Sequence, residues 1–156
     1  MTITTGRRTA EHPDEVTVFL IGMRLNHLHR ADLWGPVAAA MPRMQAYLRT
    51  HPQAGMLGFH QWFGRTTIMV SYWRSPEHLQ TFAADPDLPH LGPWRSFRRL
   101  TGHPAVGIWH ETYVVPATSR EVVYVNMPDF GLGRATRAVA VGDGTRTARQ
   151  RLATAR

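Results

Sequence analysis

The sequence predicts an α+β fold in which a ferredoxin-like βαββαβ unit forms one antiparallel sheet with both helices on one face. Apolar runs typical of strands alternate with segments of helical periodicity in the order strand, helix, strand, strand, helix, strand. The chain of 156 residues is long enough for one domain with a core and too short for two. The strand residues are apolar on both faces, so a single sheet would expose a large apolar surface, which predicts a homodimer.

The first half of this unit follows a polar segment, residues 1–14, which is expected to be a flexible leader. Residues 16–25 are almost continuously apolar, which indicates a strand buried on both faces. Residues 34–52 carry apolar side chains three to four positions apart and predict a helix. A kink or restart is expected at Pro42, because proline removes a backbone donor. The helix should stop before His51, since a residue that precedes proline avoids the helical region.

The second half begins with two strand-like runs, residues 56–64 and 66–73, which predict a hairpin. A short helix is expected after Ser75, because serine caps a helix, the next residue is proline, and a glutamate then complements the helix dipole. Residues 94–100 resume helical spacing after an interruption rich in proline. The last strand of the unit is GIWHETYVVP, residues 107–116.

The net charge of +7 lies mostly in the C-terminal part of the chain. Residues 134–156 are rich in Arg, Gly, Ala and Thr, lack a strong apolar pattern, and are expected to form a disordered basic tail. The domain itself is expected to span residues 15–133 and is nearly balanced in charge. The sequence therefore predicts no specific nucleic-acid partner.

The composition excludes several functional classes. The chain contains no cysteine, which excludes disulfides, thiolate metal sites and cysteine nucleophiles. It contains no lysine, which excludes Schiff-base chemistry by its own side chains. No apolar run approaches the roughly 18–20 residues needed to span a bilayer, and the first residues lack the pattern of a signal peptide. A cytoplasmic protein without a membrane partner is the resulting expectation.

The last strand places two ionisable residues side by side, His110 and Glu111. Successive side chains of a strand point to opposite faces, so the two cannot meet in one pocket. We expect His110 to face the helices and a pocket, and Glu111 to face a partner sheet, although a single β-bulge would reverse this phase. Each is a candidate catalytic residue. The alternative for each is a hydrogen bond at an interface or at a strand edge.

A third candidate catalytic residue, His90, precedes Trp94 and Phe97 by four and seven residues. On a continuous helix these three side chains would line one face, with His90 acting as a base, a proton shuttle or an iron ligand. The alternative is a loop histidine that caps a helix end.

Further expected substrate-binding residues lie on the strands. His60 is expected to share a strand face with Met56 and Trp62. Aromatic side chains at such positions belong to a core more often than to a ligand site, but they also fit a wide pocket for a planar ligand. The expected substrate-binding residues are His60, Trp62, Tyr72, Trp94, Phe97 and Trp109.

A metal centre is not expected. Residues 26–29, Asn-His-Leu-His, offer donors together with Asp32, but such sites need a well-placed third ligand and a supporting shell. Residues 129–133, DFGLG, are too short for a phosphate loop and are expected to form a turn.

Several quoted stretches together carry a resemblance: RTTIMVSYWRSPEHLQTFA, then HLGPWRSF, GIWHETYVVP and NMPDFGLG. Over residues 16–133 the chain resembles the monooxygenase-like family, formerly a domain of unknown function, in the antibiotic-biosynthesis-monooxygenase superfamily of dimeric α+β barrels. The resemblance implies a pocket between the sheet and the helices of each protomer. In the haem-degrading branch of that superfamily an iron-ligating histidine lies on the second helical region, where His90 holds a similar place.

Three functions remain open at this point. The first is a cofactor-free monooxygenase that uses O2 on a hydrophobic, aromatic or polycyclic small molecule, as the resemblance implies. The second is a haem-binding enzyme of the haem-degrading or aldoxime-dehydratase type. The third is a homodimer that binds a hydrophobic metabolite without turnover.

Overall fold

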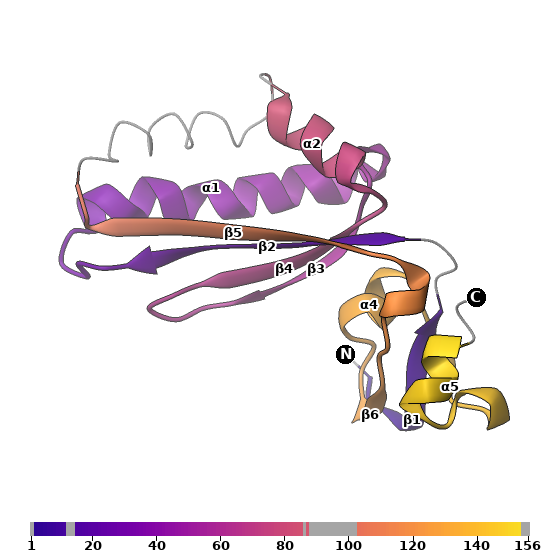
Figure 1. Ribbon diagram of the computed structural model, residues 1–156. Coiled ribbons are helices and arrows are strands. Elements are labelled where there is room, and N and C mark those ends of the chain that lie inside the picture. The colour runs from indigo at the N-terminus through magenta and orange to yellow at the C-terminus, as the bar shows by residue number, and fades with distance from the viewer. Residues whose placement is uncertain (1, 12–14, 86, 88–102, 154–156) are drawn as a thin grey trace.

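The computed structural model describes residues 2–11, 15–85, 87 and 103–153. Its main sheet consists of four antiparallel strands in the order β3-β4-β2-β5, and both α1 and α2 lie on the same side of it (Figure 1). The predicted ferredoxin-like α+β fold is therefore confirmed. The elements of this unit are β2 (Val16–Leu25), α1 (Ala31–Thr50), β3 (Met56–Trp62), β4 (Ile68–Trp73), α2 (Pro76–Ala84) and β5 (Val106–Val115), with a short 3-10 turn η1 (Pro52–Ala54) after α1.

The end of α1 and the start of α2 lie where their sequences predict them. Helix α1 stops one residue before His51, and the Ser75 hydroxyl accepts a hydrogen bond from the His78 backbone N–H at the start of α2. Helix α1 nevertheless continues through Pro36 and Pro42, so of the kink or restart predicted at Pro42 the restart does not occur. Among the described residues, no helix is both long enough and apolar enough to cross a membrane.

The core lies between α1, α2 and the main sheet. Trp73 is 1% exposed and packs with Leu48, Leu79 and Phe82 from the two helices. Its indole Nε1 donates to the Ser71 hydroxyl (3.0 Å). That hydroxyl donates in turn to a backbone carbonyl of β2 (3.0 Å). The Trp73 indole and the Ser71 hydroxyl are thus both hydrogen-bonded, as buried polar groups usually are.

A β-bulge near the start of β3 corrects one prediction. The pairing of β3 with β4 shifts between Met56 and Gly58. Met56 therefore packs against the helix-side core, whereas His60 pairs with Val70 and shares the opposite face with Trp62. Strict alternation along the strand predicts Met56, His60 and Trp62 on one face, which is wrong for Met56. An extra residue on one strand reverses the phase.

A second sheet, called the small sheet below, joins segments from the beginning and the end of the described chain in the order β6-β1-β7. Together with α4 and α5 it lies at one end of the main sheet, on the side away from α1 and α2 (Figure 1). Its elements are β1 (Thr4–Glu11), η2 (Ala117–Ser119), β6 (Tyr124–Met127), α4 (Gly131–Ala135), β7 (Arg137–Ala140), η3 (Asp143–Thr145) and α5 (Ala148–Ala153).

The small sheet differs from the flexible leader predicted over residues 1–14 and from the disordered tail predicted over residues 134–156. Long-range polar contacts order these segments where an apolar pattern is missing. The Gly6 N–H donates to the Asn126 side chain (2.8 Å), and the Thr9 hydroxyl donates to the backbone carbonyl of Val122 (2.8 Å).

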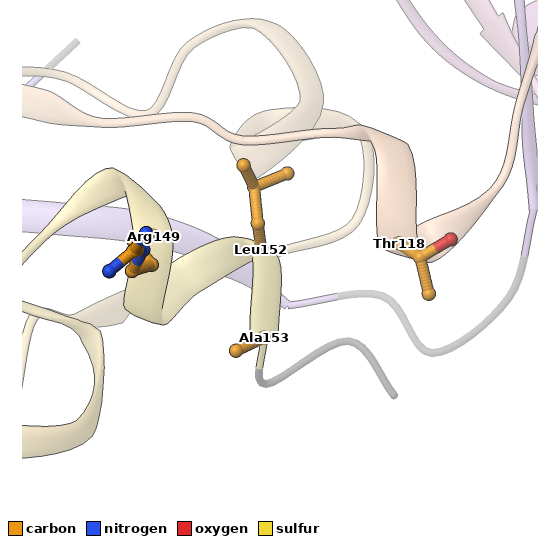
Figure 2. A pocket seen from close by; sticks show the side chains of 4 residues that line it. All are labelled: Thr118, Arg149, Leu152 and Ala153. Carbon is orange, nitrogen blue, oxygen red and sulfur yellow. The ribbon is translucent and has the colours of Figure 1, made fainter.

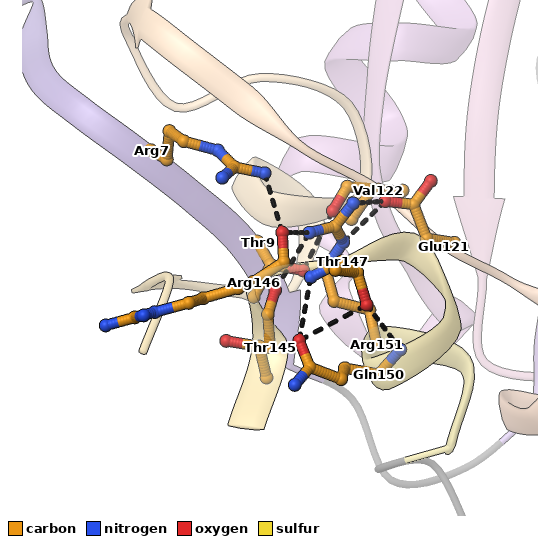
Figure 3. Close-up of polar contacts among 9 residues, drawn as sticks. All are labelled: Arg7, Thr9, Glu121, Val122, Thr145, Arg146, Thr147, Gln150 and Arg151. Carbon is orange, nitrogen blue, oxygen red and sulfur yellow. Dashed lines mark hydrogen bonds and ion pairs between the residues drawn. The ribbon is translucent and has the colours of Figure 1, made fainter. Parts of the chain in front are cut away.

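Helix α5 is held to η3 and to the segment before β6 by Arg151, which is only 8% exposed. Its guanidinium forms an ion pair with Glu121 and donates to the carbonyl of Thr145 (2.8 Å), as Figure 3 shows. The Arg7 side chain donates to the neighbouring carbonyl of Arg146 (2.9 Å). The arginines that suggested a solvated tail are therefore partly structural.

Candidate functional site

Strand β5 carries His110 and Glu111 on opposite faces of the main sheet. His110 pairs with Ile21 and Glu111 with Leu20. The His110 ring lies 5.9 Å from the ring of Phe19, which packs against the helix-side core. His110 therefore lies on the helix-covered face, the phase that the sequence predicted. It is exposed there, because β5 is an edge strand of the sheet.

The surroundings of His110 on this face are mostly apolar, with a few polar groups. Ile21 and Phe19 of β2 are half-buried beside it. Further along β2, the Thr17 hydroxyl is fully buried and has no hydrogen-bond partner among the described residues. Across the sheet, the Gln45 side chain of α1 donates to the Gln61 side chain of β3 (3.2 Å). An imidazole on an apolar surface with few competing polar groups suits proton transfer to or from a hydrophobic substrate.

The opposite face, which we call the open face, carries Glu111. The Tyr113 hydroxyl donates to its carboxylate (2.6 Å), and this hydrogen bond raises the pKa of Tyr113. Trp109 occupies the same face, and its Nε1 is buried without a hydrogen-bond partner among the described residues. Glu111 is exposed and partnered here, so it lies away from His110 and its neighbours.

His60 also lies on the open face, where it contacts α4. Its Nε2 accepts a hydrogen bond from the Gly131 N–H (2.9 Å), and its ring stacks on Phe130 with centroids 4.1 Å apart. Burial, with a smaller contribution from the charge of Arg134, lowers the pKa of His60. A neutral imidazole with an unprotonated Nε2 is the form that can accept this bond. His60 is thus a docking residue for α4.

The glycines of the DFGLG segment explain the rest of this contact. Gly131 has a φ of 53°, a left-handed conformation that glycine adopts without strain. The Gly133 N–H donates to the Tyr124 hydroxyl (3.0 Å), and a side chain at this position would collide with the Tyr124 ring. Burial raises the pKa of Tyr124 and that of Tyr72 beside it. Asp129 and Phe130 lead into α4, whereas Gly131, Leu132 and Gly133 form the first turn of that helix, so the turn predicted for the whole segment is wrong for its last three residues.

The contact between His60 and α4 predicts a pH dependence of stability. Because the folded pKa of His60 is lowered, the unfolded chain binds a proton more readily. The free energy of unfolding should therefore be highest above about pH 6.5 and decrease as the pH falls toward the folded pKa. Urea unfolding at a series of pH values measures this. His60→Gln keeps an acceptor but does not titrate, and should show a weaker decrease. His29→Gln, which replaces an exposed histidine, is the control and should show the same decrease in the free energy of unfolding as the wild type. Equal slopes for all three proteins would contradict the prediction.

The predicted site residues do not converge on one pocket. His110 alone of the described candidates lies on the helix-covered face, whereas the others lie on the open face: Glu111, His60, Trp62, Tyr72 and Trp109. His90, Trp94 and Phe97 lie outside the described residues. Phe19 and Thr17 lie on the helix-covered face but are not among the predicted site residues. Their spacing of two along β2 places them on one face of the strand. Only the pairing of β2 with β5 shows that His110 lies on this face as well.

His110 does not line either of the following two hollows on the surface of the described residues. A cavity of about 410 Å³ lies between η2 and α5, lined by Thr118, Arg149, Leu152 and Ala153 (Figure 2). A second, of about 320 Å³, lies where α1 and α2 meet, near Tyr47 and Phe82. No group of three or more His, Cys, Asp or Glu side chains within the described ranges could hold a metal ion.

Comparisons of the sequence with known proteins give a consistent picture. The family model for monooxygenase af470-like proteins matches residues 16–132. Monooxygenase af470 of Aspergillus fumigatus is 28% identical, with 83% of this chain and 54% of the relative covered. Phenylacetaldoxime dehydratase of Bacillus sp. strain OxB-1 is 27% identical, with 74% of this chain and 32% of the relative covered. The chain thus spans about half the length of the first relative and a third of the second.

Among solved structures, the aldoxime dehydratase OxdRE in complex with butyraldoxime has a similar fold. The TM-score is 0.65 at 18% sequence identity, with 87% of this chain and 45% of that chain covered. At this level of identity the likeness concerns the fold alone.

Proposed function

The chain belongs to the monooxygenase af470-like family, and on that premise we propose that it is a cofactor-independent monooxygenase. Its substrate is a hydrophobic small molecule, aromatic or polycyclic, with an acidic C–H or O–H bond. The observation that carries the proposal is the place of His110, an imidazole on the helix-covered face next to Phe19. Histidine is the side chain best suited to proton transfer near neutral pH.

In this mechanism the substrate itself reduces O2. His110 takes a proton from an activated CH2 group, and the resulting carbanion transfers electrons to O2 and forms a C–O bond to it. Loss of the second C–H proton and cleavage of the O–O bond give a ketone and one water, so that CH2 plus O2 becomes C=O plus H2O. The protein supplies a base, donors for the developing anion and an apolar surface. His110 returns its proton to the departing oxygen.

A haem-binding enzyme of the aldoxime-dehydratase type is the second candidate. The similarity to phenylacetaldoxime dehydratase supports it. The described helices contribute little to a haem site: α1 contains no histidine, and His78 of α2 packs against Gly55 and hydrogen-bonds Ser75. The iron ligand that the resemblance implies, His90, lies outside the described residues. Haem would supply the iron for the reaction, and His90 would be the residue to hold it.

One pair of measurements separates these functions. We expect the purified protein to be colourless, without a Soret band, and to consume O2 when an anthrone or quinol is added. A Soret band that is lost in His90→Ala would favour the haem enzyme. Tight binding of the same compounds without O2 consumption and without a Soret band would favour the third function, a non-catalytic binder of a hydrophobic metabolite.

A homodimer is part of the proposal. The open face of the main sheet presents Val18, Leu20 and Val70, all half-buried, and Tyr113, which is 50% exposed. Helix α4 covers only the part of this face near β3. A second copy stacked on the remainder would remove this apolar surface from water.

A further inference from the structure

The end of the main sheet where β2 finishes carries an unusual group of exposed apolar side chains. Phe63, at the turn between β3 and β4, is 85% exposed, and Leu28, in the loop after β2, is 58% exposed. Trp62, the last residue of β3, is 44% exposed. We call Leu28, Trp62 and Phe63 the apolar tip. The Trp62 ring lies edge-on to that of Phe130 (centroids 6.0 Å apart). Single exposed apolar residues are common, but two on adjoining loops and a third at the end of β3 call for an explanation.

Hydrogen bonds hold the two loops of the apolar tip together. The Arg65 guanidinium donates to the backbone carbonyls of Leu25 (3.2 Å) and Asn26 (3.1 Å), and the Leu25 N–H donates to the Arg65 carbonyl (2.8 Å). The Leu28 carbonyl accepts from the Trp34 indole (3.1 Å), which ties its loop to α1. The backbone of both loops is therefore fixed by hydrogen bonds, so the apolar tip loses little conformational entropy on binding.

The charge around the apolar tip has one sign. Arg24 and Arg65 flank it, and Arg24 donates to the Thr66 hydroxyl (2.8 Å). No Asp or Glu occurs in residues 16–31 or 56–74. The nearest acid along the first of these segments, Asp32, is paired with Arg30 (2.7 Å). The tip therefore combines aromatic and aliphatic side chains with uncompensated positive charge.

We propose that the apolar tip is a peripheral binding surface for anionic lipid bilayers. Phenylalanine, leucine and tryptophan side chains insert at the boundary between headgroups and acyl chains, and arginines next to them attract anionic headgroups. The sequence predicts no membrane partner, because no segment is long enough to span a bilayer. A peripheral contact needs no such segment. A protein that acts on or binds hydrophobic molecules would meet them at this surface, where they accumulate.

Co-sedimentation of the full chain with sucrose-loaded vesicles tests the proposal. We expect binding to vesicles of phosphatidylcholine mixed with phosphatidylglycerol, weaker binding to phosphatidylcholine alone, and weakening by salt. Phe63→Ser should reduce partitioning by about tenfold or more, and Arg24→Gln should reduce it on anionic vesicles only. Val125→Ser is the matched control, because Val125 is 53% exposed but lies on the small sheet; it should bind like the wild type.

Three outcomes would overturn the proposal. The first is no binding to anionic vesicles, and the second is equal binding by the wild type and Phe63→Ser. The third is a change of oligomeric state in Phe63→Ser, measured by light scattering, since it would assign the tip to a contact between copies. Phe63 is almost fully exposed, so its replacement should leave the melting temperature unchanged, and circular dichroism verifies that each variant is folded. The oxygenase proposal is independent of all these results.

Discussion

Replacing His110 with Gln is expected to lower kcat for O2 consumption with an anthrone or quinol by about 10²–10⁴-fold, the usual contribution of a general acid–base group. Glutamine has a similar size and polarity but cannot exchange a proton near neutral pH. His110 is exposed on an edge strand, so the replacement should leave the free energy of unfolding almost unchanged. KM should change less than kcat, because the imidazole acts on the proton rather than on the apolar body of the substrate.

The matched control for this variant is His29→Gln, which replaces an exposed histidine in the loop between β2 and α1. It should retain wild-type kcat. Full activity of His110→Gln would contradict the proposed mechanism, in which His110 is the base.

Trp73→Ala is expected to lower the free energy of unfolding by about 3–5 kcal/mol, the usual cost of truncating a large core side chain. Trp73 is 1% exposed and joins β4 to both helices. The truncation also removes the donor to the Ser71 hydroxyl, which is fully buried. Domains of this size have only about 5–15 kcal/mol of stability in all, so the variant should be partly unfolded at physiological temperature.

Urea unfolding followed by circular dichroism measures this loss. Trp62→Ala is the control, because it truncates the same residue type on the neighbouring strand at a site that is 44% exposed. Its loss should be well below that of Trp73→Ala. Similar losses in the two variants would mean that the packing against α1 and α2 does not dominate the stability of the fold.

The sequence predicted the main sheet well because local signals and long-range packing agree there. The β2 segment is almost continuously apolar, and Ser75 with Pro76 marks the start of α2 both in sequence and in structure. The phase of His110 followed from simple alternation, because β5 pairs with β2 without a bulge over ten residues. Simple alternation did not predict the phase of His60 relative to Met56, because the bulge near Met56 leaves no clear mark in the sequence.

The small sheet could not be predicted by the same reasoning. Strand β1 reads TTGRRTAE, which is polar and interrupted by glycine. Its order comes from partners more than a hundred positions away, such as the bond from Gly6 to Asn126. The arginines of residues 134–156 similarly predict a solvated, charged segment. In the structure, however, Arg151 is buried and forms an ion pair with Glu121, a partner that only the fold brings near it. Composition alone does not distinguish a solvated arginine from one held in such a contact.

The central place of β1 between β6 and β7 governs the order in which the chain can acquire its structure during translation. Both neighbours of β1 are synthesised more than a hundred residues after it, so it stays unpaired while the main sheet is being made. Pairing across such a span closes a long loop, which slows folding. The nascent chain therefore presents the two unoccupied edges of β1 until β6 and β7 emerge, an interval in which a chaperone or another nascent chain could occupy them.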